Sequence, residues 1–73
     1  MSFEPGDYVK FEIKNESTGE SEWMWLHIES CDDSKGIVFG ILDSQPVVMT
    51  EELRLGQRLA VSYENIREHR KPT

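Results

Sequence analysis

The sequence predicts an all-β domain, a small five-stranded SH3-like barrel, with an OB-like barrel as the alternative. Short apolar runs, alternating or continuous, are separated by turn-rich segments, and no stretch keeps a helical period for ten residues or more. Gly6-Asp7-x-Val9-x-Phe11 and Gly56-Gln57-x-Leu59-x-Val61 share one spacing, in which a glycine turn leads into a strand with apolar residues in a single phase. Five short strands with tight turns in a chain of 73 residues favour a barrel over a sandwich.

The first half of the chain divides into three predicted strands joined by two turns. Residues 8–14 alternate between apolar and polar side chains, which predicts the first strand. NESTGES follows as a hairpin loop, in which Gly19 is available for a positive φ. Glu22–Ser30 is the second predicted strand, and CDDSKG turns the chain into a third, Ile37–Leu42. The third strand is nearly all apolar, which predicts a central strand covered on both faces.

The middle of the chain is predicted to leave the sheet and return to it briefly. Pro46 ends the third strand, because proline cannot donate to a ladder and restricts the residue before it. Val47–Met49 is predicted as a short strand at an edge. At most one helical turn follows near residues 50–53. Thr50 can cap it, and two glutamates sit where the backbone amides are free.

The last part of the chain is predicted to complete the domain and then to continue as a tail. Gln57–Tyr63 resumes the alternation, and Glu64–Ile66 indicates a closing turn anchored by an isoleucine. We therefore expect a single β-barrel domain over residues 1–66. Residues 67–73 are polar, which predicts a flexible C-terminal tail.

The phase of the second strand decides which way the two tryptophans point. Its even-numbered positions offer Met24, Leu26 and Ile28, whereas the odd-numbered positions from 23 to 29 hold both tryptophans, a histidine and a glutamate. Burying the odd positions would remove the last two side chains from water without an evident partner. We therefore expect the even positions to fill the core, which directs Trp23 and Trp25 to the opposite face.

Large aromatic side chains on the non-core face of a sheet are candidates for a binding surface. Tryptophan and tyrosine dominate the energetics of protein interfaces, because they bring much contact area and lose little rotamer freedom. Alternatively, Tyr63, Ile66 or the segment around Pro46 covers Trp25 and forms a satellite cluster. The residues predicted to bind a partner are Trp23, Trp25, Tyr8, Lys10 and His27.

Several short segments resemble one family of small bacterial domains. They are Met24-Trp25-Leu26, the run GILDSQPV over residues 40–47, and LRLGQRL over residues 53–59 followed by Glu64-Asn65-Ile66. In order, these segments resemble the YegJ-like family of unknown function. The sequence departs from the family pattern at Gln57, where an acidic residue is expected, and after Ile66. The resemblance implies a bacterial or phage origin and a small β domain, and it implies no activity, cofactor or catalytic residue.

Charge and composition narrow the class of partner. Fourteen acidic and eight basic residues give a net charge of −6, which disfavours nucleic acid and anionic membrane surfaces and favours a basic protein partner. The longest apolar run is far too short to cross a bilayer and no signal peptide opens the sequence, so a cytoplasmic location is expected. One cysteine and two histidines provide no ligand set at zinc-site spacing, and we expect no metal and no cofactor.

No motif in the sequence announces catalysis. His27 near Glu29 is a weak candidate for a general base, since residues two apart on a strand commonly pair as solvated neighbours. Cys31 precedes two aspartates, which raise the pKa of a thiol and suppress the thiolate. Asp32, Asp33 and Ser34 form a turn that lacks the spaced ligands of a calcium loop. We therefore expect a protein that is not an enzyme.

The leading hypothesis is a small acidic protein-interaction module of unknown partner. A specific version is an immunity or antagonist type protein that neutralises a basic protein. The alternative is a single-stranded oligonucleotide-binding barrel, in which the surface aromatics stack on bases and the basic residues Arg67, Arg70 and Lys71 meet the phosphates. The sequence sets no expectation for the oligomeric state.

Overall fold

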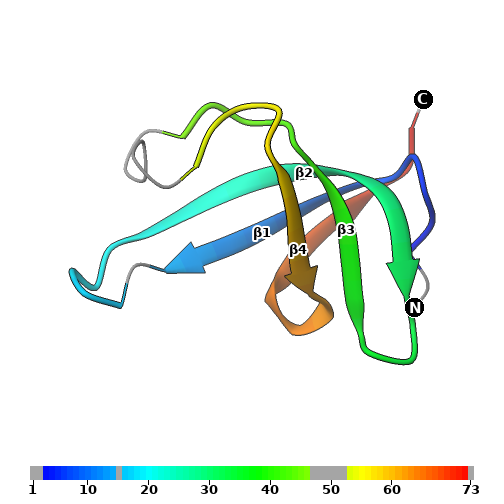
Figure 1. The fold of residues 1–73 in the computed structure, drawn as a ribbon, viewed down its shortest axis with the longest axis horizontal. Coiled ribbons are helices and arrows are strands. Elements are labelled where there is room, and N and C mark those ends of the chain that lie inside the picture. Colours follow the sequence, from blue (N-terminus) through cyan, green and yellow to red (C-terminus); the bar gives the residue numbers. More distant parts are fainter. Residues whose placement is uncertain (1–2, 15, 47–52, 73) are drawn as a thin grey trace.

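The domain is built from five antiparallel strands in one sheet (Figure 1). The computed structural model describes residues 3–14, 16–46 and 53–72. The elements are β1 (Tyr8–Lys14), β2 (Ser21–Asp32), β3 (Ile37–Leu42), β4 (Arg58–Ser62), the 3-10 turn η1 (Tyr63–Asn65) and β5 (Ile66–Arg70). The predicted all-β class is confirmed.

The strand order explains why the sheet bends into a barrel-like shape. The order is β4-β3-β2-β1-β5, so that β4 and β5 stand at opposite edges. Only the three residues of η1 join these two strands, and three residues span roughly 10 Å at most. The end of β4 must therefore approach the start of β5, which bends the sheet, as Figure 1 shows. No ladder joins β4 to β5 within the described ranges, so the barrel-like sheet is not closed.

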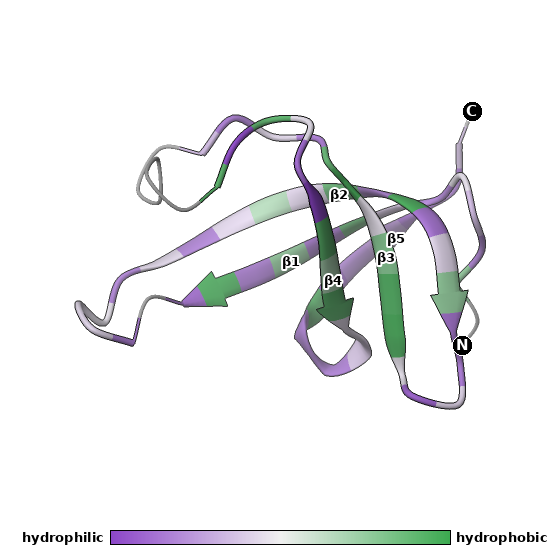
Figure 2. Ribbon diagram, viewed as in Figure 1, coloured by the Kyte–Doolittle hydropathy of each residue, from purple (hydrophilic) through white to green (hydrophobic). Residues whose placement is uncertain are grey.

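The core forms from the alternate residues that face the inside of the bend. Figure 2 shows this alternation as green and purple bands along β1. Met24, Leu26 and Ile28 are almost completely buried, which confirms the predicted phase of β2 and places both tryptophans on the opposite side. Buried residues of the core are Phe3, Val9, Phe11, Met24, Leu26, Ile28, Val38, Leu42, Leu53 and Val61.

The predicted strand bounds agree with the structure in most of the sequence. The strands over residues 8–14 and 37–42 lie where they were expected. β2 extends beyond its predicted end to Asp32, and the 3-10 turn occupies Tyr63–Asn65, one residue earlier than the predicted closing turn. The strand predicted at 47–49 lies outside the described residues, as does most of the helical turn predicted at 50–53.

The prediction of a polar tail beginning at residue 67 is wrong for residues 67–70. These residues belong to β5, which pairs with β1 in the register Tyr8 with Arg70 and Lys10 with Glu68. A bulge between Lys10 and Phe11 interrupts the register, so apolar and polar residues of β5 do not alternate regularly in the sequence. The domain therefore continues through Arg70.

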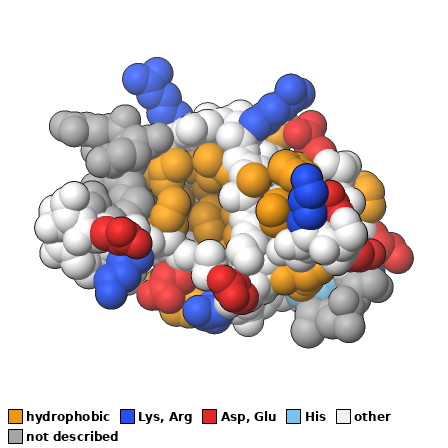
Figure 3. All heavy atoms as spheres, turned by 60° about the horizontal axis from the view of Figure 1, so that its bottom comes forward, with side chains coloured by type: hydrophobic (Ala, Val, Ile, Leu, Met, Phe, Trp, Pro, Cys, Tyr) orange, Lys and Arg blue, Asp and Glu red, His pale blue; other side chains and the backbone are white. Residues whose placement is uncertain are grey.

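The predicted double coverage of β3 is also wrong at one position. Phe39 is 40 % exposed and lies between Ser30 of β2 and Ala60 of β4. The described residues hold two other large apolar side chains with such exposure, Trp23 and Leu55. Figure 3 shows one side of the molecule, where hydrophobic side chains gather at the surface with charged side chains around them.

Gly40 is required by a close approach of β2 and β3. A Cβ atom on Gly40 would lie 2.2 Å from the backbone oxygen of His27 and 2.9 Å from its carbonyl carbon. The approach falls next to the register shift between Ile28 and Ser30, where β2 carries its bulge. A backbone atom cannot move away as a flexible side chain can, so only glycine fits here.

We predict that Gly40→Ala lowers the free energy of unfolding by about 2–3 kcal/mol or more, because the backbone of β2 must shift to accept the methyl group. Chemical denaturation followed by tryptophan fluorescence measures the change. Phe39→Ala, at the exposed neighbouring position, is the control and should cost under about 1 kcal/mol. Equal losses in both variants would contradict the role assigned to Gly40.

Candidate binding face

All five residues predicted to bind a partner lie on one face of the sheet. Tyr8 is opposite His27, and Lys10 is opposite Trp25, in the ladder between β1 and β2. Their neighbours Val9 and Leu26 are fully buried, so these side chains point away from the core. The outer face, as we name it, comprises Tyr8, Lys10 and Glu12 of β1, Trp23, Trp25 and His27 of β2, and Arg67, Glu68 and Arg70 of β5.

Trp23 is the most exposed aromatic side chain of the outer face, and it lies among cations. Its side chain is 47 % exposed. The Lys10 ammonium lies 5.8 Å and the Arg67 guanidinium carbon 6.0 Å from the ring centroid, the distance range of cation–π contacts. Lys10 also pairs with Glu68 at 3.5 Å, and Arg67 with Glu12 at 3.8 Å. Such exposed ion pairs add little stability, but they arrange the charges around the indole.

Trp25 is half-buried, and an arginine partly covers it. The guanidinium carbon of Arg70 lies 5.1 Å from the centroid of its ring. The backbone of Trp25 is fixed from the other side, because its N–H donates to Ser44 Oγ at 2.9 Å and its carbonyl accepts from the Asp43 N–H at 2.8 Å. Tyr63, predicted as a cover, packs instead edge-on against Phe3. The cover comes from β5, which the sequence did not reveal.

A shallow groove of about 290 Å³ opens beside Trp25. Tyr8 forms one side of it, and its ring stacks on His27 with the centroids 4.7 Å apart. Arg70 and Lys71 bring positive charge to the groove and Asp43 brings negative charge. The residues that line it are Tyr8, Trp25, Asp43, Arg70, Lys71 and Pro72.

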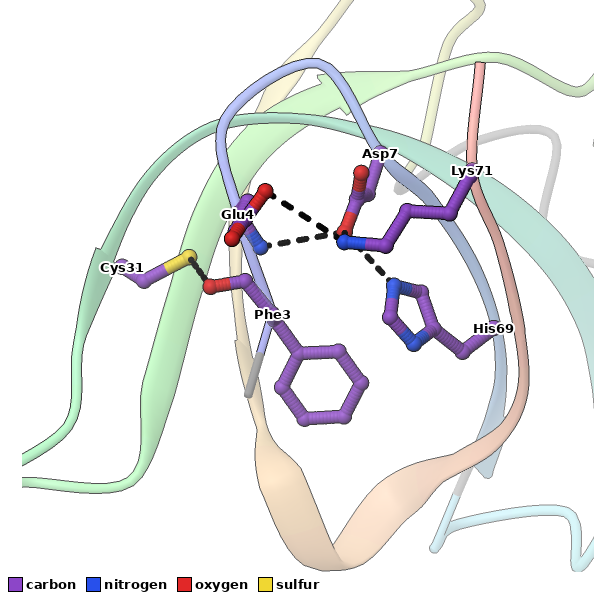
Figure 4. A network of polar contacts seen from close by, with 6 residues as sticks. All are labelled: Phe3, Glu4, Asp7, Cys31, His69 and Lys71. Atoms are coloured by element: carbon purple, nitrogen blue, oxygen red, sulfur yellow. Dashed lines mark hydrogen bonds and ion pairs between the residues drawn. The ribbon is translucent and has the colours of Figure 1, made fainter. Parts of the chain in front are cut away.

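A buried carboxylate fixes the end of β5 from the core side (Figure 4). Asp7 is only 2 % exposed and is the one buried charged side chain in the described part of the sequence. Its Oδ2 lies 2.6 Å from His69 Nε2 and 3.1 Å from Lys71 Nζ, and it accepts the Glu4 N–H at 3.1 Å. Sequence reasoning missed this group. The one available signal was an aspartate directly before a strand of buried residues.

The Asp7 contacts also position Arg70. His69 and Lys71 reach the same carboxylate, and the residue between them therefore points to the opposite side of the strand. That side is the outer face, where Arg70 lies over Trp25. The contacts with Asp7 and the contact with Trp25 therefore lie on opposite sides of β5, toward the core and toward the outer face.

Hydrogen bonding decides the ionisation of Asp7. Burial favours the neutral acid, but the hydrogen bonds from His69, Lys71 and the Glu4 backbone outweigh it, so the pKa of Asp7 is lowered. Since the folded state holds the proton less tightly than the unfolded state, the resulting stability is complete above the ordinary pKa of 3.8. It is lost as the pH falls through the lower folded value.

Cys31 and Asp32, which the sequence analysis considered for reactivity or metal binding, both make contacts within the fold. The pKa of Cys31 is raised, which confirms the predicted direction, but the largest cause is burial, followed by the negative charge of Asp33. Its thiol donates to the Phe3 carbonyl at 3.3 Å. Asp32 caps its own turn, accepting from the Ser34 hydroxyl at 2.6 Å. Across the described ranges, no three histidine, cysteine or acidic side chains are grouped to hold a metal ion.

Similarity to known proteins assigns this protein to no family. Comparison with protein-family models, with curated proteins and with solved structures gave no match to any of them. In the part of the sequence that the structure describes, no helix is long and apolar enough to cross a membrane.

We predict that Asp7→Asn lowers the free energy of unfolding at pH 7 by about 1–3 kcal/mol, because hydrogen bonds to a charged group are lost. The difference from wild type should shrink below about pH 3.8 as the wild-type carboxylate takes up its proton. Denaturation at several pH values measures both effects. A difference that stays constant down to about pH 2 would show that charge is not the cause.

Cys31 is predicted to react slowly with iodoacetamide at about pH 8, because its raised pKa leaves little thiolate and burial limits access. Mass spectrometry of the native and the guanidinium-unfolded protein gives the two rates, and we expect the native rate to be severalfold lower. Equal rates would mean that the thiol is open and reactive.

Proposed function

We propose that this protein is a non-enzymatic protein-interaction module that binds its partner through the outer face. The observation that carries the proposal is the exposure of Trp23, which stands 47 % open between Lys10 and Arg67. Tryptophan and arginine side chains are enriched at the centres of protein interfaces. The groove beside Trp25, two residues further along β2, adds a shallow pocket to the same face.

The surroundings of the reactive groups support a role without catalysis. His27 stacks on Tyr8, and His69 pairs with a carboxylate that also accepts from Lys71. The raised pKa of Cys31 disfavours a nucleophilic thiolate. Each of these groups is used for packing or for anchoring a strand.

The net charge of −6 favours a partner with a positive net charge, because the field of the whole molecule guides the encounter. A basic protein neutralised by an immunity or antagonist type protein would fit this chemistry. A cytoplasmic location and a bacterial source, the latter implied by the resemblance to the YegJ-like family, belong to the same proposal.

Binding of single-stranded oligonucleotides is the second candidate, favoured by one observation. Arg67 and Arg70 lie on the same face as the tryptophans, where they could meet phosphates. The guanidinium groups lie over the rings, however, so a base must displace them to stack. Glu12 and Glu68 add negative charge beside them. These features leave the candidate in second place.

The central test is capture of partners from a bacterial lysate by the immobilised wild type and by Trp23→Ala. We expect the variant to lose at least about tenfold in affinity for the captured protein, the range of an interface hot spot. Phe39→Ala, which removes a comparably exposed aromatic from β3, is the matched control and should bind as wild type does.

Unfolding curves of both variants verify that they fold. Capture that Trp23→Ala leaves unchanged would overturn the choice of face. A single-stranded dT oligonucleotide that quenches tryptophan fluorescence at low salt, with an effect that salt reverses, would instead favour the second candidate.

A further inference from the structure

We infer that the groove beside Trp25 receives a carboxylate of the partner protein, which Arg70 binds. This inference rests on the proposed function and specifies the chemistry of the partner. The contact is an aspartate or glutamate side chain of the partner that pairs with the guanidinium in the groove.

Arg70 differs from the other cations of the outer face. Lys10 pairs with Glu68, and Arg67 pairs with Glu12. Lys71, at the edge of the groove, pairs with Glu4 and Asp7. For Arg70, the described residues provide no carboxylate within ion-pair distance and no hydrogen-bond acceptor. Among the described residues, the one partner of its guanidinium is the Trp25 ring, in a cation–π contact.

The position of Arg70 is also set before any partner arrives, by the pairing of β5 with β1 and by the contact with the Trp25 ring. Its backbone is paired opposite Tyr8, and its neighbours His69 and Lys71 are both fixed on the buried Asp7. An ordered guanidinium offers a planar pair of N–H donors that matches a carboxylate, and little side-chain freedom is lost on binding. Arg70 is exposed, so a carboxylate can reach its guanidinium from solvent.

The charges of the groove favour one carboxylate over a nucleic-acid backbone. Asp43 lines the groove and would repel a ligand with several negative charges, as would the net charge of −6. A single carboxylate is balanced by the one cation that, among the described residues of the face, lacks an acidic partner.

The spacing of the tryptophans adds a second requirement on the partner. Trp23 and Trp25 are two residues apart on one strand, which separates them by about 7 Å. A partner that covers both rings therefore carries a residue for Trp23 close to the carboxylate at Arg70. We expect an apolar side chain there, next to the acidic residue.

The experiment uses a phage-displayed library of random peptides, selected against the full-length protein and against Arg70→Gln. Wild-type selection should enrich peptides that contain an acidic residue beside an apolar one. One such peptide, synthesised, should bind Arg70→Gln at least about tenfold more weakly. Arg58→Gln is the matched control, because this exposed arginine lies on β4 beside Glu29, and its affinity should stay within about twofold of wild type.

A second pair of measurements separates charge from folding. Replacing the acidic residue of the peptide by its amide should weaken binding to wild type but not further weaken binding to Arg70→Gln. Arg70→Lys keeps the positive charge but lacks the planar pair of N–H donors. Its affinity for the peptide should lie between those of wild type and Arg70→Gln. Thermal unfolding verifies that both variants fold.

The remaining outcomes distinguish this inference from the proposed function. Selected peptides that depend on Trp23 but carry no acidic residue, and bind Arg70→Gln as well as wild type, would overturn the inference alone. If the selection yields no peptide whose binding depends on Trp23, both this inference and the proposed function are overturned. Tighter, Arg70-dependent binding of a single-stranded dT oligonucleotide would identify phosphate as the ligand and overturn the carboxylate.

Discussion

The contacts of the Asp7 carboxylate with His69 and Lys71 hold the end of β5 in place, and the outer face is complete only with this strand. Asp7 lies almost completely inside the domain, and His69 and Lys71 both reach its Oδ2 atom. A buried carboxylate is costly unless it is fully paired, so the end of β5, with His69 and the following Lys71, is required at this edge. Without β5, the outer face would lose both arginines that lie over its tryptophans.

The outer face carries three cations and two glutamates in a protein that is acidic as a whole. Lys10, Arg67 and Arg70 surround the two tryptophans, whereas the complete sequence has a net charge of −6. At long range a partner therefore meets the negative net charge of the molecule, whereas in contact it meets the cations of the outer face. In the proposed complex, the field of the whole molecule would guide a partner by its net charge, and the groove would bind a particular side chain of that partner.

Much of the sheet could be predicted from alternation. Val9, Leu26 and the residues in phase with them are buried, because a strand with one apolar phase must turn that phase inward. The same phase placed Trp23 and Trp25 outside. β5 could not be predicted in the same way. Its inward positions include His69, a polar residue that becomes acceptable only when Asp7, 62 residues away in the sequence, provides its partner. The exposure of Phe39 was missed because apolar composition does not show which neighbour covers a face.

Local periodicity was sufficient to predict the all-β class, the phase of β2 and five residues of the outer face. The tertiary structure alone decided that Arg67 and Arg70 join the face, that Arg70 covers Trp25 and that Gly40 meets the His27 backbone. Each of these contacts joins residues of different strands. Their distances depend on strand order, bulges and bending, which no local pattern encodes.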